Sequence, residues 1–271
     1  MANTNKGTRE GTEAELEFVK HANIDKSLNN PIWNLLNFKL SFNGDLEDLH
    51  IVRVTSKVYS SIQDKKILPK ADAYVVKGKI PHEYVESLDY KLTESDVENF
   101  DLKFIPFSGI SIKRPDSKKF QILKMSPNSF CKIIGNYVLG AGASIYCLKE
   151  AEIEKNNSVL NGWHTTWQEF KDYFKNIENI SLIDSDELSN SEKLGILKQV
   201  KNISNDCIKN IIQNDISKLY MVFKGTGMFE EPYPAYFLFK EGIFTMNEPF
   251  EFRVTTGSGR SKGDFTIVLK P

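Results

Sequence analysis

The sequence predicts an α/β protein, in an α+β arrangement, with a central mixed β-sheet flanked by helices and a carboxy-terminal β-rich part. Two observations indicate this fold class. A helical pattern at 12–22 precedes short strand-like segments at 49–55, 69–78 and 108–117. Strand-like runs rich in Phe, Tyr, Ile and Val then return from Leu219 towards the end of the chain, the first of them at 220–224.

The length and composition allow a well-buried core. The chain has 271 residues, of which 40% are hydrophobic, so it needs no disulfides or structural metal to fold. We expect a single domain spanning 1–271 with three parts. These parts are a core at about 11–149, a mostly helical segment at about 150–214, and the β-rich part at about 219–271.

Charge and cysteine content exclude several classes of protein. The formal net charge is −1, so any attraction to nucleic acid has to come from local basic patches. Cys131, Cys147 and Cys207 are odd in number and widely spaced, which is typical of reduced thiols in a cytoplasmic protein. No run of about eighteen apolar residues occurs, so we expect no membrane span and a cytoplasmic location.

The amino-terminal segment 12–22 has the features of a helix start. Thr12 can cap the helix, Glu15 stands three residues further on, and Gly11 precedes the cap. Acidic residues in a first turn also stabilise the helix dipole, which is an alternative role for them. The helix is therefore predicted to begin at Thr12.

Two short segments carry the strongest chemical signal. Asp72 stands at the start of an apolar run, Ala-Tyr-Val-Val. In the second segment the two-residue period of a strand puts Ser111 and Lys113 on one face and Ile110 and Ile112 on the other. Cleavage of a phosphodiester needs a carboxylate for a divalent cation and positive charge near the phosphate. Asp72 and Lys113 are candidates for these two roles.

These segments, Pro-Lys-Ala-Asp at 69–72 and Ser-Gly-Ile-Ser-Ile-Lys-Arg-Pro-Asp-Ser at 108–117, resemble the PD-(D/E)xK nucleases, and among them the type II restriction endonucleases. The resemblance covers roughly 11–130. It departs from the family pattern in two places, because two residues separate Pro69 from Asp72 and Ser111 stands where an acid is usual. Some restriction enzymes use Ser-x-Lys here and recruit a carboxylate from elsewhere.

The resemblance implies a restriction-endonuclease-like core and a magnesium-dependent reaction. The implied catalytic residues are Asp72, Lys113, Ser111 and Glu15, with Glu15 supplying the carboxylate that Ser111 lacks. The implied Mg²⁺ ligands are Asp72, Glu15 and the main-chain carbonyl of Ile112. The implied products carry 5′-phosphate and 3′-hydroxyl ends.

Several alternatives stay open at this point. Asp89/Lys91 and Asp101/Lys103 also fit the acid-x-lysine pattern after Asp72. The first pair is followed by a helix-capping segment, and a proline soon after the second pair argues against a central strand. Glu13 or Glu17 could contribute in place of Glu15.

Basic residues near the second segment and near the carboxy terminus are candidates for DNA contact. Arg114, Lys118 and Lys119 follow Lys113 closely and suit phosphate neutralisation. Arg253 and a glycine- and serine-rich loop containing Ser258, Arg260 and Lys262 suit contacts to phosphates or guanine. A solvated strand edge and an ordinary hairpin turn are the alternatives.

The predicted partner is double-stranded DNA, cut at a specific sequence. Cutting both strands of a palindrome needs two active sites, so we expect a homodimer. The resemblance also implies a cognate DNA methyltransferase as a functional partner. Two alternatives are a structure- or damage-specific repair nuclease of the same superfamily and a DNA-binding protein with a decayed nuclease site.

Overall fold

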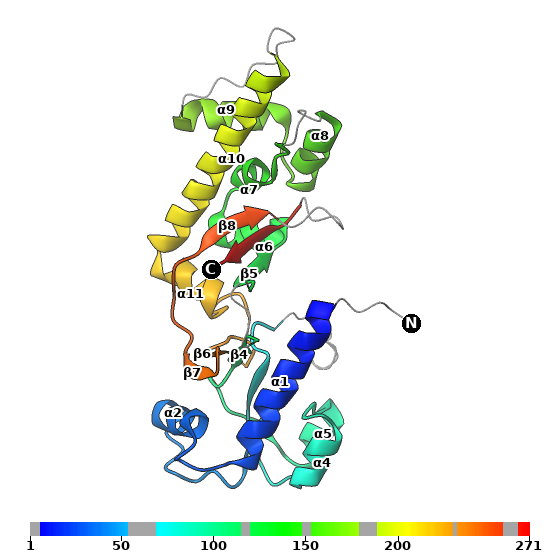
Figure 1. Cartoon of the computed structure of the whole chain (residues 1–271), viewed down its shortest axis with the longest axis vertical. Coiled ribbons are helices and arrows are strands. Elements are labelled where there is room, and N and C mark those ends of the chain that lie inside the picture. The colour runs from blue at the N-terminus through cyan, green and yellow to red at the C-terminus, as the bar shows by residue number, and fades with distance from the viewer. Residues whose placement is uncertain are drawn as a thin grey trace. The chain divides into compact units, whose positions relative to one another are not determined.

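The chain forms two compact units, each built from two separate stretches of sequence (Figure 1). The computed structural model describes residues 6–53, 69–114, 120–147, 153–178, 189–229, 232–256 and 265–271. The first unit comprises 1–118 with 223–249, and the second comprises 119–222 with 250–271. These boundaries differ from the three expected parts, and a single domain spanning the chain stays a prediction.

The first unit contains a six-stranded mixed sheet in the order β1-β2-β4-β6-β7, with β3 paired to β2. Only the β4–β6 pair is parallel among the described pairings. The strands are β1 (Leu49–Arg53), β2 (Ala73–Lys77), β3 (Lys103–Phe104), β4 (Ile110–Ile112), β6 (Phe237–Lys240) and β7 (Ile243–Met246). The prediction of a mixed sheet flanked by helices is confirmed.

Helices of the first unit begin at recognisable capping residues in two cases. In α2 (Pro31–Leu40), Asn30 accepts a hydrogen bond from the main chain at the first turn. In α5 (Glu94–Asn99), Thr93 and Asp96 form a reciprocal capping box, within the segment that the sequence indicated as helix-capping. The short helix α4 (His82–Ser87) precedes α5.

The longest helix of this unit, α1 (Lys6–Ile24), starts upstream of its predicted cap. Thr12 and Gly11 lie inside the helix, so the prediction that it begins at Thr12 is wrong. A β-carbon at Gly11 would meet nothing within 4 Å. A glycine at such an open position costs only about 1 kcal/mol in a helix, so it does not end α1.

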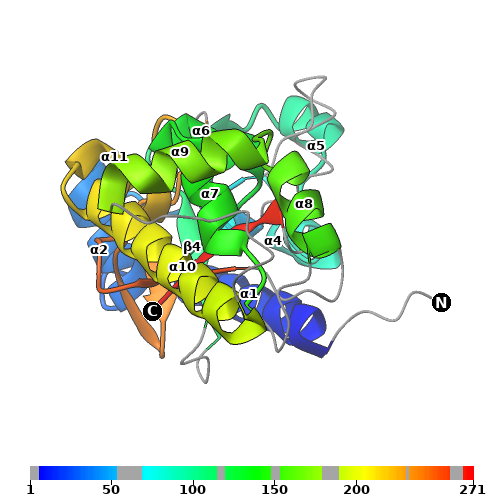
Figure 2. The same cartoon turned by 90° about the horizontal axis from the view of Figure 1, so that it is seen from above.

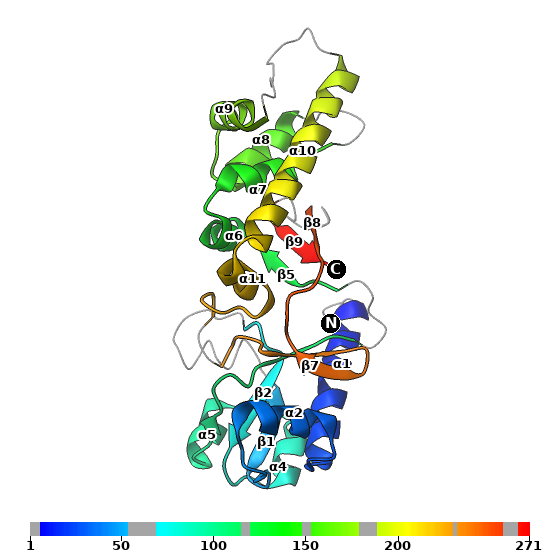
Figure 3. The same ribbon diagram turned by 90° about the vertical axis from the view of Figure 1, so that its left-hand side faces the viewer.

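The core of the first unit lies between α1 and the sheet (Figure 3). Phe18 of α1 packs on Phe239 and Phe244, with ring centroids 4.6 and 5.9 Å apart. Asn23 fixes the other end of α1, because its amide donates to Ile51 O at 2.7 Å and its oxygen accepts from Ile51 N at 3.1 Å. Full burial of an apolar side chain such as that of Phe18 stabilises the folded state by about 1.5–3 kcal/mol.

In its described residues, the second unit combines helices α6 to α10 and most of α11 (Ile216–Phe223) with a three-stranded antiparallel sheet in the order β5-β9-β8. In Figure 2, helix α7 lies beside the long helix α10. The helices are α6 (Pro127–Ile134), α7 (Tyr137–Ser144), α8 (Ile153–Gly162), α9 (Trp167–Glu178) and α10 (Asn190–Gln213). The strands are β5 (Leu123–Met125), β8 (Arg253–Thr256) and β9 (Ile267–Lys270).

The β-rich part expected from Leu219 begins differently. Residues Ile216–Phe223 form helix α11, so the predicted strand at 220–224 is wrong. Asp215 accepts hydrogen bonds from Ser217 N at 2.9 Å and Lys218 N at 3.3 Å. A short apolar run fits the residue period of a strand and of a helix equally well. The helix forms here because Asp215 caps its first turn.

Candidate active site at the start of strand β2

Asp72 precedes strand β2 and is attached to β4 by both its main chain and its side chain. Asp72 N donates to Ile110 O at 2.8 Å. Its carboxylate Oδ2 accepts a hydrogen bond from Ile112 N at 2.7 Å and another from Ser111 Oγ at 3.3 Å. The structure therefore brings together Asp72, Ser111 and Ile112, which the sequence placed in separate segments.

The pairing of β4 determines which groups face Asp72. Ile110 and Ile112 are in register with Phe237 and Phe239 of β6, and Lys113 N donates to Phe239 O at 2.8 Å. Peptide groups alternate in direction along a strand. The Ile112 N–H and C=O therefore both face away from β6, on the side where Asp72 lies.

Glu15 reaches the same region from helix α1. Burial raises its pKa above the ordinary value, and the negative charge of Asp72 raises it further. Arg53, hydrogen-bonded to Glu15, and the nearby charge of Lys113 act in the opposite direction. Glu15, Asp72 and Lys113 thus lie within electrostatic reach of one another. Glu13 and Glu17 are exposed on the same helix.

Lys70 is a charged residue of this site that the sequence did not single out. Its main-chain N–H and that of Ala71 both donate to Tyr233 O, at 3.0 and 2.8 Å. Burial lowers the pKa of Lys70 to about 7, and the charge of Lys113 adds to that effect, while Asp72 opposes it. The only sequence signal was its place two residues before Asp72.

Arg53 is the second residue that was missed. It ends strand β1, and its side chain is only 3% exposed. One guanidinium nitrogen donates to Glu15 Oε2 at 3.2 Å and to Thr12 O at 3.3 Å. A basic residue at the end of a strand gives no local sign that it will meet a helix forty residues upstream.

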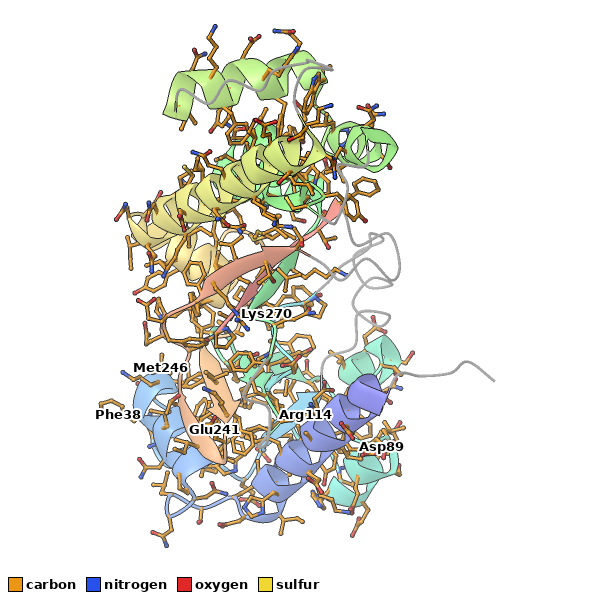
Figure 4. The ribbon with its side chains drawn as sticks, turned by 45° about the horizontal axis from the view of Figure 1, so that its top comes forward. Phe38, Asp89, Arg114, Glu241, Met246 and Lys270 are labelled. Atoms are coloured by element: carbon orange, nitrogen blue, oxygen red, sulfur yellow. The ribbon has the colours of Figure 1, made fainter. Side chains whose placement is uncertain are left out.

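The predicted DNA contacts are spread over both units. Arg114 lies beside α1 (Figure 4) and forms an ion pair with Glu10 of that helix. Arg253 is exposed on β8 in the second unit, in register with Lys270. Lys118, Lys119, Ser258, Arg260 and Lys262 lie outside the described residues.

The alternative acid-x-lysine pairs lie elsewhere on the first unit. Lys103 is in register with Lys77, at the far end of β2 from Asp72. Asp89 and Asp101 have positive φ angles of 51° and 46°, typical of turns. Neither pair is joined to Asp72 by a hydrogen bond that the structure shows.

The groups near Asp72 include oxygen donors of the kind that a hard divalent cation prefers. Two carboxylates and a main-chain carbonyl match the ligand preference of Mg²⁺, which usually retains several waters. In the described part of the chain, no group of three or more His, Cys, Asp or Glu residues could hold a metal.

Comparisons with known proteins give no family for this chain. No protein-family model matches it, and no curated protein sequence matches it. Among the described helices, none combines the length and apolar character that a membrane crossing requires.

Proposed function

We propose that this protein is a magnesium-dependent endonuclease of the PD-(D/E)xK type that cuts double-stranded DNA at a specific sequence, as type II restriction enzymes do. The observation that carries the proposal is the attachment of the Asp72 carboxylate to Ser111 and Ile112 of β4. This contact puts Asp72 beside the strand that leads into Lys113. The mixed sheet flanked by helices agrees with the same proposal.

Asp72, Glu15 and the Ile112 carbonyl would hold Mg²⁺ in this proposal. When bound, Mg²⁺ supplies positive charge to the phosphate and lowers the pKa of its water ligands. Glu15 takes the place of the family's missing acid, because it reaches Asp72 from α1. Ser111 donates to Asp72 Oδ2 and orients that carboxylate, so its hydroxyl is a partner of the ligand and not a substitute for it.

Lys113 would orient the attacking water and stabilise the negative charge that develops at phosphorus. Lys70 is a second amine near Asp72, and because its pKa is lowered to about 7 it would add a partial positive charge there at neutral pH. In-line attack would leave 5′-phosphate and 3′-hydroxyl ends. Arg114 and Arg253 are the described candidates for contact with the DNA backbone, and Arg114 would exchange Glu10 for a phosphate.

The wider proposals follow from cutting both strands of a duplex. A homodimer would present two active sites related by a two-fold axis. A DNA methyltransferase that protects the same sequence would be its functional partner, and both would act in the cytoplasm.

The test is cleavage of plasmid and phage DNA by the purified protein, with Mg²⁺ or with EDTA, alongside Asp72→Asn. Discrete fragments that require Mg²⁺ and disappear with the variant are expected. Asp101→Asn makes the same change at an exposed turn away from Asp72, so it is the matched control and is expected to cut as the parent does. Cutting confined to branched or damaged DNA would contradict sequence-specific cleavage and favour a repair nuclease.

Ser111 favours one competing function, a DNA-binding protein whose nuclease site has decayed. That function predicts a shift of DNA mobility in gels without cleavage under any metal condition. In that case Ser111→Glu, which restores the usual acid, would create Mg²⁺-dependent cleavage only if Asp72 and Lys113 are still able to act. Cleavage by the parent protein contradicts this alternative directly.

A further inference from the structure

Arg53 links strand β1 to helix α1 at the level of the candidate site. Its main-chain N–H donates to Tyr90 O at 2.7 Å, and it is in register with Ala73, the residue after Asp72. The backbone of Arg53 is therefore fixed next to the start of β2. Its side chain leaves this fixed point and ends on α1.

The contact with α1 involves one helical turn. The same guanidinium nitrogen donates to Thr12 O at 3.3 Å and to Glu15 Oε2 at 3.2 Å. Residues three apart lie on one face of a helix, so this nitrogen constrains both the rotation of α1 and the direction of the Glu15 side chain. The contact uses Oε2, and the structure shows no hydrogen-bond partner for Oε1 among the described residues.

Stability alone does not account for an arginine at this position. Arg53 Nε is buried and has no hydrogen-bond partner among the described residues. A buried donor without a partner destabilises the folded state. Asn23 already joins α1 to β1 through two hydrogen bonds with Ile51. The Asn23–Ile51 hydrogen bonds therefore already hold α1 against β1, and they leave no atom of the Asn23 amide group without a hydrogen bond.

We propose that Arg53 is a positioning residue that directs the Glu15 carboxylate towards Asp72 and so completes the divalent-cation site. This inference rests on the proposed metal-dependent function. Removal of Arg53 would leave Asp72 in place, because Asp72 is held by β4, and would free Glu15 to turn away. A cation bound between Glu15 and Asp72 would also offset the repulsion between the two carboxylates.

The experiment is a titration of the full-length protein with Mn²⁺ in the absence of DNA, followed by electron paramagnetic resonance of the free ion. The variants are Arg53→Met, Glu15→Gln, Asp72→Asn and the double change of Arg53 and Glu15. Arg53→Met is expected to weaken Mn²⁺ binding by about 10–100-fold, the range for residues that orient metal ligands. The double variant should bind Mn²⁺ no more weakly than Glu15→Gln alone. Both changes act on the same ligand, the Glu15 carboxylate, so their effects should not add.

Asn23→Ala is the matched control, since it loosens α1 from β1 without touching Glu15 or Arg53. Unchanged Mn²⁺ binding by Asn23→Ala is expected, and an equal loss there would overturn the proposal in favour of simple helix docking. If Arg53→Met does not fold, Arg53→Gln takes its place with the same expected loss.

Parent-like Mn²⁺ binding by the folded Arg53 variant, with binding lost in Asp72→Asn, would overturn the role of Arg53 alone. A parent protein that binds no Mn²⁺, or an Asp72→Asn variant that binds it equally well, would overturn the proposed nuclease site itself. The two failures are thus distinguishable.

Discussion

The two ends of strand β2 carry similar residue types but differ in how those residues are held. At the first end, Asp72 is joined to Ser111 and Ile112 of β4 by hydrogen bonds. At the other end, Lys77 is in register with Lys103 of β3, which follows Asp101 in a turn. The better literal match to an acid-x-lysine motif is thus the one remote from Asp72.

The separation between the two ends follows from strand geometry. Ala73 pairs with Ile110, while Lys77 pairs with Lys103, so the two contacts are four residue steps apart along β2. At about 3.3 Å per residue, this distance is about 13 Å. A cation at Asp72 would be out of reach of Asp101. Strand register, more than motif spacing, therefore favours Ser111 and Lys113.

Electrostatics also distinguish the ends. Next to Asp72, burial and a like charge raise the pKa of Glu15. Near Lys77, burial lowers the pKa of His50 to about 4, with the charge of Lys26 contributing. Lys26 Nζ lies 3.4 Å from His50 Nδ1. The first end gathers groups that a cation would stabilise, whereas the second contains a neutral imidazole beside an ammonium.

The largest expected effect comes from exchanging the two lysines for methionine. Lys113→Met should reduce the rate of plasmid cleavage by about 10²–10⁴-fold, the usual effect of removing a group that stabilises or transfers charge. Lys103→Met, exposed at the other end, should cleave at the parent rate. A loss of cleavage in Lys103→Met with parent-like Lys113→Met would reverse the assignment.

A smaller effect is expected for glycines at the two ends. A β-carbon at Gly109 would collide with the main-chain carbonyl oxygen of Pro234, and one at Gly78 would lie 2.5 Å from Leu102 Cδ2. Gly109→Ala should destabilise the protein by about 1–3 kcal/mol or more, since a backbone atom cannot turn aside as a leucine methyl can. Gly78 has a φ of +156°, so Gly78→Ala adds some strain.

Urea unfolding of both glycine variants checks this prediction. Gly109→Ala should also lose Mn²⁺ affinity, because Gly109 precedes the strand that holds Asp72. If Gly78→Ala weakened Mn²⁺ binding more than Gly109→Ala did, the proposal that the cation binds at the Asp72 end of β2 would be contradicted.

The smallest effect concerns the pH dependence of stability at the far end. The folded-state pKa of His50 is about 4, below its ordinary 6.5, so the unfolded chain binds more protons between these values. The contribution of neutral His50 is present above pH 6.5 and is lost as the pH falls towards 4. In His50→Gln, the urea midpoint of unfolding should depend less on pH between 4 and 6.5 than it does in the parent. An equally strong pH dependence in the variant would contradict the prediction.

Local signals in the sequence were sufficient for some elements and insufficient for others. The alternation of Ile110 to Lys113 predicted β4, and the capping residues before α5 indicated a helix or a loop, of which the structure has the helix. The run at 220–224 failed because an apolar segment alone fits a strand or a helix, and Asp215 decided it. Thr12 failed because α1 extends upstream through Gly7 and Gly11, which have weak helix propensity, so no local pattern marked its true start.

The candidate site was predictable only where residues lie close in sequence to its strands. Asp72, Ser111 and Lys113 are of this kind, and their catalytic roles stay predictions. Arg53 and Lys70 matter through the packing of α1 and the segment around Tyr233, which no local pattern encodes. Residues far apart in sequence and joined by tertiary contacts are invisible to motif spacing.

The parallel pairing of β4 with β6 has a consequence for the synthesis of the chain. The whole segment 119–222 lies between these strands in sequence, so the ribosome completes Lys113 long before the neighbouring strand exists. Contacts this distant form late, because a long loop has to close first. A nascent or truncated chain that ends before Phe237 lacks one border of β4. Under the proposed function, hydrolytic capacity would then appear only in nearly full-length molecules, and a DNA-cutting activity would reach the producing cell's DNA late in synthesis.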